Sequence, residues 1–385
     1  MKTITVLTTT RAEYGLLSGL IKKLKSTNEY IVKVAVTGTH LSEKHGGTFR
    51  EIEDDGIGID VKIQALQDSD TSSDITKSMA KVMIGFADYF SKNCSDALIV
   101  LGDRYETLAV CLAAMNERIP IIHIHGGETT EGAIDEAIRH AISKLSYLHF
   151  TSTEEYRKRV VQLGESPDRV FNVGALGVEN ILKLNLMEKN ELANSIGFDI
   201  IGNKYAVVTF HPVTLENNSA EKQCEALLKA LDKRNEISYI ITKANADSGG
   251  NVINEMLEKY ASSRKNVLLV ASLGVLRYLS SLKYAEFVIG NSSSGIIEAP
   301  SFGIPTINIG DRQKGRIKAC SIIDCDVSYD SICDAIDKAL DDEFKEVCKK
   351  VVNPYGKGDT SDCIISTIDY AFEKGINIKK KFYDL

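Results

Sequence analysis

The sequence predicts an α/β fold made of two Rossmann-like, doubly wound domains that face each other across a cleft. Three observations predict it. The chain has 385 residues, more than one ordinary hydrophobic core accommodates. Short apolar runs alternate with longer segments of helical periodicity, and this alternation starts twice along the chain. Runs such as Ala97–Leu101 are apolar on both faces, as expected of parallel strands that helices cover on both sides.

The first series of elements fills the N-terminal half of the chain. Short apolar runs predict five strands, at Thr3–Thr8, Ile31–Thr37, Ala97–Leu101, Pro120–Ile124 and Tyr147–Thr151. Helical periodicity follows these strands, for example at Leu16–Leu24, Glu106–Asn116 and Ala133–Leu145. A second series then predicts strands at Tyr205–Phe210, Ser238–Thr242, Val267–Ala271, Phe287–Gly290 and Pro305–Ile309.

The boundary between the two domains is expected near residues 174–203, because the segment 183–203 is polar and helix-rich, as a connector would be. We expect an N-terminal domain at 1–175 and a C-terminal domain at 176–360. The remaining residues, 361–385, include a helix at about Thr360–Lys374 that could pack back on the first domain.

Composition excludes several classes of protein. The formal net charge of −7 disfavours sequence-independent binding to nucleic acid, which needs a basic surface. No apolar run reaches the ~18–20 residues that span a bilayer, and the N-terminus has no secretory pattern, so a cytoplasmic protein is expected. The eight cysteines include no C-x-x-C pair and indicate neither a metal finger nor a disulfide framework.

Two loops after strands of the first series carry candidate ligand-binding residues. Arg11 is expected at the N-terminus of a helix, where a guanidinium and backbone N–H groups suit a phosphate; the alternative is an exposed loop arginine. Asp103, directly after the strand 97–101, either lies at the ligand or caps the next helix, with Glu106 three residues on. Arg104 beside it could pair with a phosphate.

The densest cluster of titratable side chains is the segment 123–140. Its adjacent glycines, Gly126 and Gly127, allow a close approach between backbone and ligand. Asp135 and Arg139 are expected on one helix at spacing i, i+4, where a surface ion pair is the alternative interpretation. No third metal ligand has recognisable spacing near His123 and His125, so no metal site is predicted.

The second series has three comparable loops. His211 follows a strand and precedes a proline, and it could donate to a phosphate or act as acid or base. The segment 290–300 follows a strand and opens a short helix, which predicts an anion site. Glu298, one turn later, could accept the two hydroxyls of a ribose, and Arg312 follows another strand. Neither a Walker A pattern nor G-x-G-x-x-G after the first strand occurs, which disfavours kinases and dehydrogenases.

Taken in order, these motifs resemble the UDP-N-acetylglucosamine 2-epimerase family. The resemblance rests on Arg-Ala-Glu-Tyr-Gly (11–15), Gly-Asp-Arg (102–104), the block 123–140, His-Pro-Val-Thr (211–214), Gly-Asn-Ser-Ser-Ser-Gly (290–295) and Gly-Asp-Arg-Gln (310–313). It is closest to the hydrolysing branch, which supplies N-acetylmannosamine-type sugars for sialic-acid-like nonulosonates. It implies a GT-B-like fold, an elimination of UDP followed by hydration of the glycal, and no redox cofactor or metal.

The resemblance implies that the N-terminal domain carries the sugar and the catalytic groups and that the C-terminal domain binds UDP. It also implies roles for individual residues. The acid/base carboxylates of the family fall on Asp103 and Asp135, and its catalytic or phosphate-contacting histidine falls on His211. The candidate UDP contacts are Arg11, Arg104, His211, Asn291, Ser292, Ser293, Gly295, Glu298 and Arg312. The candidate sugar contacts are Glu128, Glu131 and Arg139.

One departure from the family pattern concerns the sugar. Many members carry Glu where this chain has His125, so we include His125 among the catalytic candidates, although Glu128 and Glu131 are nearby. The change could reflect a different sugar, such as a UDP- or GDP-linked N,N'-diacetylbacillosamine. A GT-B glycosyltransferase and a non-catalytic nucleotide-sugar binder are the remaining alternatives. We expect a UDP-sugar as the ligand, no nucleic acid or membrane partner, and a homodimer or homotetramer.

Overall fold

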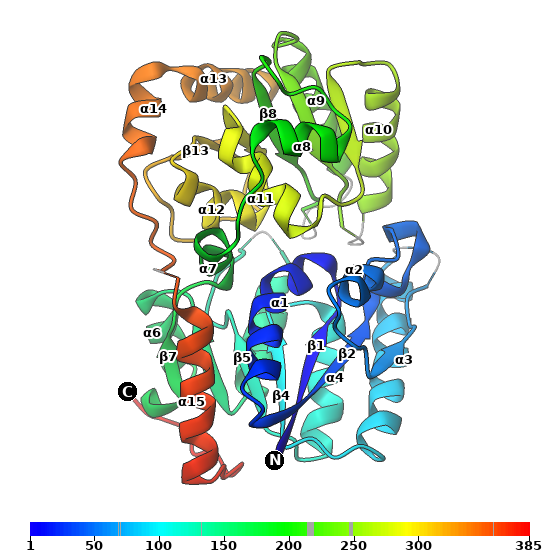
Figure 1. Ribbon diagram of the computed structural model, residues 1–385, viewed down its shortest axis with the longest axis vertical. Helices are drawn as coiled ribbons and strands as arrows, with labels where there is room; N and C mark the ends of the chain where they lie inside the picture. Colours follow the sequence, from blue (N-terminus) through cyan, green and yellow to red (C-terminus); the bar gives the residue numbers. More distant parts are fainter. Residues whose placement is uncertain (68, 70, 132, 214–218, 246–248, 357) are drawn as a thin grey trace. The chain divides into compact units, whose positions relative to one another are not determined.

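The computed structural model describes residues 1–385 except 68, 70, 132, 214–218, 246–248 and 357. The chain divides into two compact units (Figure 1). Unit 1 comprises Met1–Glu128, Asp135–Asn180 and Tyr355–Leu385. Unit 2 comprises Thr129–Ile134 and Ile181–Pro354. Unit 1 is therefore assembled from three separate stretches of sequence.

Unit 1 is built on a seven-stranded parallel sheet in the order β3-β2-β1-β4-β5-β6-β7. Its strands are β1 (Lys2–Thr8), β2 (Tyr30–Thr37), β3 (Val61–Ile63), β4 (Ala97–Leu101), β5 (Ile121–Ile124), β6 (Leu148–Thr151) and β7 (Val170–Asn172). Its α-helices are α1 (Arg11–Ser26), α2 (Phe49–Asp54), α3 (Ser72–Phe90), α4 (Tyr105–Asn116), α5 (Asp135–Leu145), α6 (Glu154–Gln162) and α15 (Thr360–Lys374). Helix α7 (Leu176–Lys183) leads the chain into unit 2.

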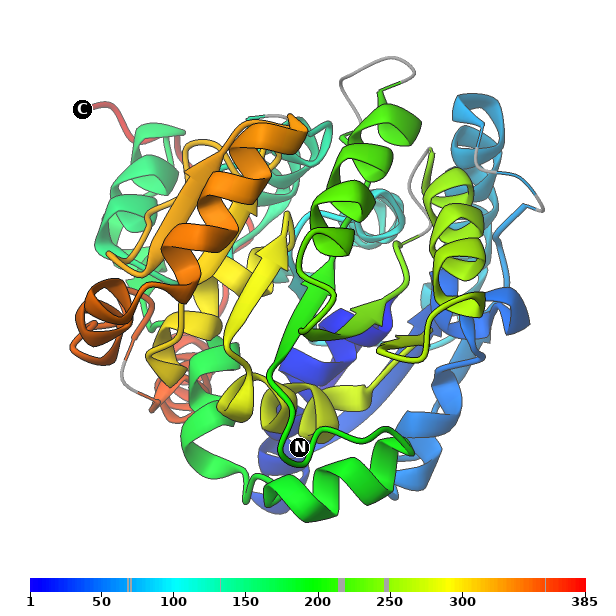
Figure 2. The same cartoon turned by 90° about the horizontal axis from the view of Figure 1, so that it is seen from above.

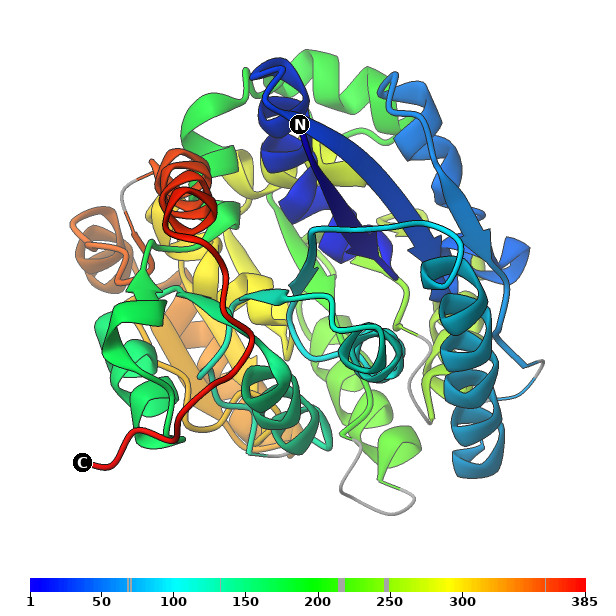
Figure 3. The ribbon, with the colours of Figure 1, turned by 90° about the horizontal axis from the view of Figure 1, so that it is seen from below.

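The strands of unit 1 are buried on both faces. In β4, Ala97, Ile99 and Leu101 pack into the core that α1 and α15 share. Leu98 and Val100 pack on the other face, against side chains of α3 and α4. The two groups of helices lie on opposite sides of the sheet (Figure 3). This layering is the doubly wound arrangement that continuous apolar strands predict.

Unit 2 repeats the same plan with a six-stranded parallel sheet in the order β10-β9-β8-β11-β12-β13. Its strands are β8 (Tyr205–Thr209), β9 (Ser238–Thr242), β10 (Val267–Val270), β11 (Phe287–Gly290), β12 (Thr306–Ile309) and β13 (Ile322–Cys325). Its α-helices are α8 (Lys189–Ile196), α9 (Ala220–Asp232), α10 (Gly250–Ser262), α11 (Gly274–Tyr284), α12 (Ser293–Ile297), α13 (Tyr329–Leu340) and α14 (Asp342–Lys349). Helices α9, α10 and α13 cover one face and α8 and α11 the other (Figure 2).

All ten predicted strands are present, with bounds that differ by no more than two residues. Strands β3, β7 and β13 are additional to the prediction. The segment 183–203 is more than a polar connector, because Leu192 and Ala193 of α8 are buried in the core of unit 2. No helix in the described part of the chain is long and apolar enough to cross a membrane.

The last residues of the chain, after α15, lie against unit 1 in an extended conformation. The Lys380 ammonium donates to the carbonyls of Lys144 (2.8 Å) and Ser146 (2.7 Å) and to both carboxylate oxygens of Glu165 (2.8 and 2.7 Å). The backbone N–H of Tyr383 donates to Gly164 O (3.0 Å). These contacts fix the C-terminal tail to the segments that flank β6.

Candidate active site

The loops with candidate residues follow β1, β4 and β5 in unit 1 and β8, β11 and β12 in unit 2, and these include the strands at which each sheet changes its direction of winding. In unit 1 this point lies between the paired strands β1 and β4, and in unit 2 between β8 and β11. Ligands of open α/β sheets bind at the carboxyl ends of strands at such points. In unit 2 the two strands approach so closely that a Cβ at Gly290 would lie 1.9 Å from Thr209 O, so only glycine fits there.

The loop after β1 is fixed by a buried glutamate. Thr10 caps α1 by accepting the Glu13 N–H (3.3 Å), and the Glu13 carboxyl accepts the Thr9 N–H (2.7 Å) and hydroxyl (2.9 Å). Burial raises the pKa of Glu13 to about 7. Arg11 is the first residue of α1 and is half-buried, so the predicted position at a helix N-terminus is confirmed.

The loop after β4 brings Asp103 to a buried arginine. The Arg139 side chain, 1% exposed, forms an ion pair with the Asp103 carboxylate and donates to Glu128 O (2.8 Å). The prediction that Asp103 could cap α4 is wrong, because Arg104 is the N-cap residue and its side chain makes no capping bond. The alternative of a surface ion pair between Asp135 and Arg139 is wrong as to the surface, because the Arg139 side chain is buried.

Arg104 is itself buried, and its Nε donates to the Glu106 carboxylate (3.3 Å) on the first turn of α4. Its guanidinium lies over the ring of Tyr105, 5.0 Å from the centroid. Glu106 also adds to the field that raises the pKa of Glu13, while Arg104 opposes it. The loops after β1 and β4 therefore share one buried group of charges.

His125 and Glu128 lie together in the loop after β5. His125 has a positive φ of 67°, which is unusual for a residue with a side chain, and its N–H donates to Phe150 O (2.8 Å). Its Nδ1 lies 3.6 Å from the Glu128 Oε1, which accepts a hydrogen bond from the Ser152 hydroxyl (2.7 Å). Both side chains are buried. A carboxylate thus lies beside the His125 imidazole.

The two remaining carboxylates of the segment 123–140 that were candidates, Asp135 and Glu131, belong to different units. Asp135 is the first residue of α5, one turn before Arg139, which confirms the predicted helix and spacing. Glu131 belongs instead to unit 2, is exposed, and has its N–H bonded to Lys314 O (3.3 Å). The structure therefore groups Asp103, His125, Glu128, Asp135 and Arg139 within unit 1, without Glu131.

In unit 2, His211 and Asn291 connect the two loops after β8 and β11. The Asn291 side chain accepts the His211 N–H (2.7 Å) and donates to His211 O (2.8 Å). The His211 Nδ1 accepts the N–H of Asn245 (3.2 Å), which leaves Nε2 as the nitrogen that carries the proton in the neutral ring. Thr214, part of the same motif, lies outside the described residues.

The serine-rich loop opens α12 as predicted. Ser292 is the N-cap and its side chain accepts the Ser294 N–H (3.4 Å). Ser293 is half-buried at the first position of the helix, and Gly295 is buried against Thr306. The Ser294 hydroxyl donates to Glu298, and burial raises the pKa of Glu298 to about 7.

The loop after β12 contacts this serine-rich loop. Arg312 Nη1 donates to Asn291 O (3.1 Å), and so does the buried Gln313 side chain (2.9 Å). Asn291 is therefore held at its side chain by the backbone of His211 and at its carbonyl by the loop 312–313. Unit 2 thus collects His211, Asn291, Ser292, Glu298 and Arg312 at the carboxyl ends of β8, β11 and β12.

Sequence reasoning missed several groups that hold these loops. Glu13 is one, although the spacing Thr10-x-x-Glu13 is a capping-box signature that could have indicated it. Ser294 and Gln313 stand in two of the motifs quoted above, but no individual role was predicted for either. Among the described residues, no group of three or more potential ligands is arranged to hold a metal ion.

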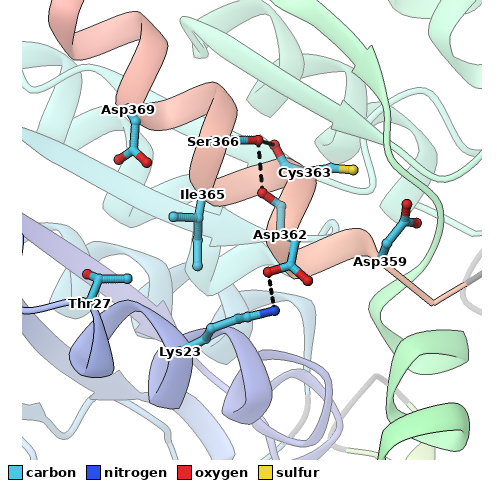
Figure 4. Close-up of a pocket in the computed structure, with 8 residues that line it drawn as sticks. All are labelled: Lys23, Thr27, Asp359, Asp362, Cys363, Ile365, Ser366 and Asp369. Carbon is cyan, nitrogen blue, oxygen red and sulfur yellow. Dashed lines mark hydrogen bonds and ion pairs between the residues drawn. The ribbon is translucent and has the colours of Figure 1, made fainter.

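A pocket of about 430 Å³ lies elsewhere in unit 1, between the C-terminal end of α1 and α15 (Figure 4). It includes Asp359, Asp362 and Asp369, and Asp362 forms an ion pair with Lys23. Lys23 and Thr27 are at the end of α1 opposite to Arg11. This pocket is therefore not part of the site at the strand ends.

Comparison with known proteins gives one family. Residues 22–369 match the family model described as UDP-N-acetylglucosamine 2-epimerase. The chain is 42% identical over 387 residues to "Polysialic acid biosynthesis protein P7" of Escherichia coli, covering 100% of this chain and 98% of that protein. It is 41% identical over 344 residues to "GDP/UDP-N,N'-diacetylbacillosamine 2-epimerase (hydrolyzing)" of Campylobacter jejuni, covering 89% of this chain and 88% of that protein.

Among solved structures, the UDP-GlcNAc 2-epimerase of Neisseria meningitidis bound to UDP-GlcNAc is similar at a TM-score of 0.81. The similarity covers 96% of this chain and 100% of that chain, with 21% sequence identity. It confirms the predicted fold class, two Rossmann-like units of the GT-B-like kind.

Proposed function

The chain belongs to the UDP-N-acetylglucosamine 2-epimerase family, and on this premise we propose a substrate and a set of catalytic groups. The protein is a hydrolysing nucleotide-sugar 2-epimerase. Its proposed reaction converts UDP-N-acetylglucosamine and water to UDP and N-acetylmannosamine. The relative named for polysialic acid biosynthesis supports this product, since N-acetylmannosamine-type sugars supply sialic-acid-like nonulosonates.

The observation that carries the proposal is the group of side chains around Arg139 in unit 1. Its guanidinium contacts Asp103 and the backbone of Glu128, and Glu128 lies beside His125. Asp135 is on the same helix as Arg139. Two carboxylates and an imidazole at the ends of adjacent strands supply the acid and base groups that epimerisation requires.

The reaction has two steps. In the first, a base removes the proton from sugar C2, the C1–O bond breaks, and UDP leaves with that electron pair, which yields a glycal. In the second, water adds its hydroxyl at C1 while C2 receives a proton on the opposite face. The C2 proton is weakly acidic, so the base must be close and well aligned.

We assign the proton transfers at C2 to Asp103 and Asp135, and we place His125 and Glu128 at the sugar. The ion pair with Arg139 favours the ionised form of Asp103, which a general base needs. Glu131 is not retained as a sugar contact, because it belongs to the other unit and is exposed.

For the nucleotide we assign His211, Asn291, Ser292, Ser293, Gly295, Glu298 and Arg312 of unit 2, with Arg11 and Arg104 as further phosphate contacts. The backbone N–H groups at the start of α12 and the arginine side chains would stabilise the charge of the departing diphosphate.

The proposal is tested by incubation with UDP-N-acetylglucosamine in deuterated water, followed by NMR of all products. We expect free UDP and free N-acetylmannosamine with one deuterium at C2. In water labelled with heavy oxygen, the label should enter the C1 hydroxyl of the sugar, because elimination breaks the C1–O bond. Label in UDP would exclude this route, and a product still linked to UDP would indicate a non-hydrolysing epimerase.

A second candidate substrate is a UDP- or GDP-linked N,N'-diacetylbacillosamine. The name of the Campylobacter relative favours it, and so does His125 at the position of the family glutamate. The two substrates are distinguished by kcat/KM measured with each nucleotide sugar. If His125 sets sugar choice, His125→Glu should shift the ratio of the two values, and unchanged ratios in both His125→Glu and His125→Ala would contradict that role.

A further inference from the structure

His123, the third residue of β5, uses both of its ring nitrogens. Its side chain is fully buried. The Nε2 atom lies 2.7 Å from Gly102 O, in the loop after β4, and the Nδ1 atom lies 3.1 Å from the Ser143 hydroxyl on α5. Both partners belong to segments that carry groups of the proposed site. The reaction itself assigns no role to this histidine.

The partners determine the form of the ring. A carbonyl oxygen can only accept a hydrogen bond, so Nε2 carries the proton and Nδ1 accepts from the Ser143 hydroxyl. Burial lowers the pKa of His123 to about 3, so the ring is neutral at physiological pH. A neutral ring with both nitrogens engaged cannot act as a proton donor or acceptor for a substrate. His123 can therefore act only by holding in place the segments that it contacts.

The contacts of His123 join the same two segments as the ion pair between Asp103 and Arg139. Gly102 directly precedes Asp103, and Ser143 lies one turn beyond Arg139 on α5. The ion pair between Asp103 and Arg139 joins the same two segments a second time. Gly102 is further held because its own N–H donates to Ile124 O (3.0 Å). A displacement of either segment would break the ion pair or the histidine contacts.

The loop with His125 and Glu128 packs on the same pair of side chains. A Cβ at Gly126 would lie 3.0 Å from the Ser143 Oγ and 3.1 Å from the His123 Nδ1. This loop therefore approaches the histidine as closely as its glycine allows. His123 thus touches all three segments that carry the proposed acid and base groups.

We propose that His123 is a positioning residue for the epimerisation, which holds the Asp103 loop, the His125 loop and α5 in one fixed arrangement. The inference rests on the proposed function for its catalytic meaning. It assigns the Nε2–H···O bond to Gly102 as the main contact, because that bond acts on the residue next to Asp103.

The neighbouring strand offers a matched control. His149 of β6 pairs in register with His123 and is equally buried. Its Nε2 contacts Glu165 (3.1 Å), which binds Lys144 and the tail residue Lys380. A substitution of His149 therefore removes a buried histidine of the same sheet without loss of a contact to the Asp103 loop.

The test compares His123→Gln, His123→Asn and His123→Leu with His149→Gln. A glutamine places an amide N–H near the position of Nε2 and can still donate to Gly102 O. An asparagine places its amide near Nδ1 and keeps only the Ser143 contact, whereas a leucine keeps neither. The measurements are kcat and KM for the nucleotide sugar, the dissociation constant of UDP, and the melting temperature of each variant.

We expect kcat to fall on the order of 10–10²-fold in the asparagine and leucine variants, the scale of a misplaced catalytic group, and glutamine to stay within about threefold of the parent. KM and UDP affinity should change little, because the proposed nucleotide contacts belong mostly to unit 2. His149→Gln should lower the melting temperature without a comparable loss of kcat. If kcat follows the melting temperature across all four variants, or if the leucine variant retains parental kcat, the positioning role is wrong.

Two measurements distinguish failure of this inference from failure of the proposed function: turnover by the parent enzyme and the protonation state of His123 by NMR. Absence of turnover in the parent would reject the proposed function alone. Nitrogen-15 NMR of histidine-labelled protein should show His123 as a neutral ring with the proton on Nε2 between about pH 5 and pH 8. A proton on Nδ1, or a charged ring in this range, would overturn the inference whatever the activity.

Discussion

Arg139 brings together the acidic groups of the candidate site in unit 1. Its guanidinium contacts Asp103, Glu128 O and Glu136 (3.3 Å), although almost none of its surface is exposed. A buried charge of this kind requires partners with fixed geometry. Of the two carboxylates that we assign to proton transfer, Asp103 is therefore held by direct contact with Arg139. Asp135 lies one turn before Arg139 on the same helix.

We predict that Asp103→Asn and Asp135→Asn each lower kcat by about 10²–10⁴-fold, the usual effect of a positioned acid or base. UDP affinity by calorimetry should change much less. The matched control is Asp96→Asn at the opposite end of β4, where the carboxylate is paired with Lys2 (2.7 Å). Near-parental kcat in both site variants would show that these carboxylates serve the fold alone.

Glu298 should couple UDP binding to a proton. Burial raises its pKa to about 7 in the free protein, and a carboxylate that accepts two ribose hydroxyls has a lower pKa in the complex. Binding then releases a proton, so UDP affinity should rise with pH by up to about tenfold per unit below 7. Calorimetry between about pH 5.5 and pH 8.5 measures this slope.

The control for that measurement is Glu298→Gln, which keeps the pH dependence of UDP itself but cannot release the proton. Glu298→Ala and Arg312→Ala should in addition weaken UDP by about 1–3 kcal/mol, as expected for loss of a charged hydrogen-bond partner. Parallel pH profiles for the parent and Glu298→Gln would mean that Glu298 does not meet the ribose.

At this scale the sequence identified the polar residues of each loop but not how they pair. Asp103 and Arg139 are 36 positions apart, and their contact depends on the order of strands in the sheet. The same holds for Arg312, whose partner is the backbone of Asn291. Local spacing predicted the helix start at Arg11 and the serine-rich loop correctly, because those features depend on neighbours in sequence.

At the scale of elements, the turn before α1 depends on one ionisable residue of the first helical turn. Glu13 holds the turn before the helix through Thr9, yet it is buried where its charge is costly. Its pKa of about 7 in the fold lies above the ordinary value of 4.5. The folded protein therefore binds a proton that the unfolded chain releases between these values.

The protonated Glu13 carboxyl therefore stabilises the fold fully below about pH 4.5. This contribution to the free energy of unfolding is lost as the pH rises through 7, a change on the order of 3 kcal/mol. In Glu13→Gln the amide oxygen can still accept from Thr9, and it carries no charge at any pH. We predict that this variant melts at a higher temperature than the parent at pH 8 and that the gap closes toward pH 5. A gap that is the same at both pH values would reject the buried, protonated carboxyl.

The strands that sequence reasoning missed share one physical property. β3, β7 and β13 lie at the edges of their sheets and have three or four residues each. Edge strands are covered less completely than central ones and alternate polar with apolar side chains, as in Lys62 and Asp324, which are exposed. The central strands β4, β9 and β11 are covered on both faces, and their bounds were predicted to the residue.

For the whole molecule, the C-terminal tail is a testable contributor to stability. Lys380→Met removes four hydrogen bonds to Glu165 and to two carbonyls, and it should destabilise unit 1 by about 1–3 kcal/mol. The melting temperature and the rate of proteolysis of the tail report this loss. Lys381→Met is the matched control, because Lys381 is exposed beside it. Equal melting temperatures for the two variants would show that the tail is not held by Lys380.

The three separate stretches of unit 1 have a consequence for synthesis on the ribosome. The core of unit 1 includes Ile364, Ile365 and Ile368 of α15, which are translated after the whole of unit 2. The last residue of unit 2 is Pro354, so the whole of unit 2 is synthesised before α15. During translation the nascent chain can therefore fold its second unit first, while the first exposes an unfilled apolar face. Chaperones that recognise such surfaces should associate with the N-terminal half until α15 has emerged from the ribosome.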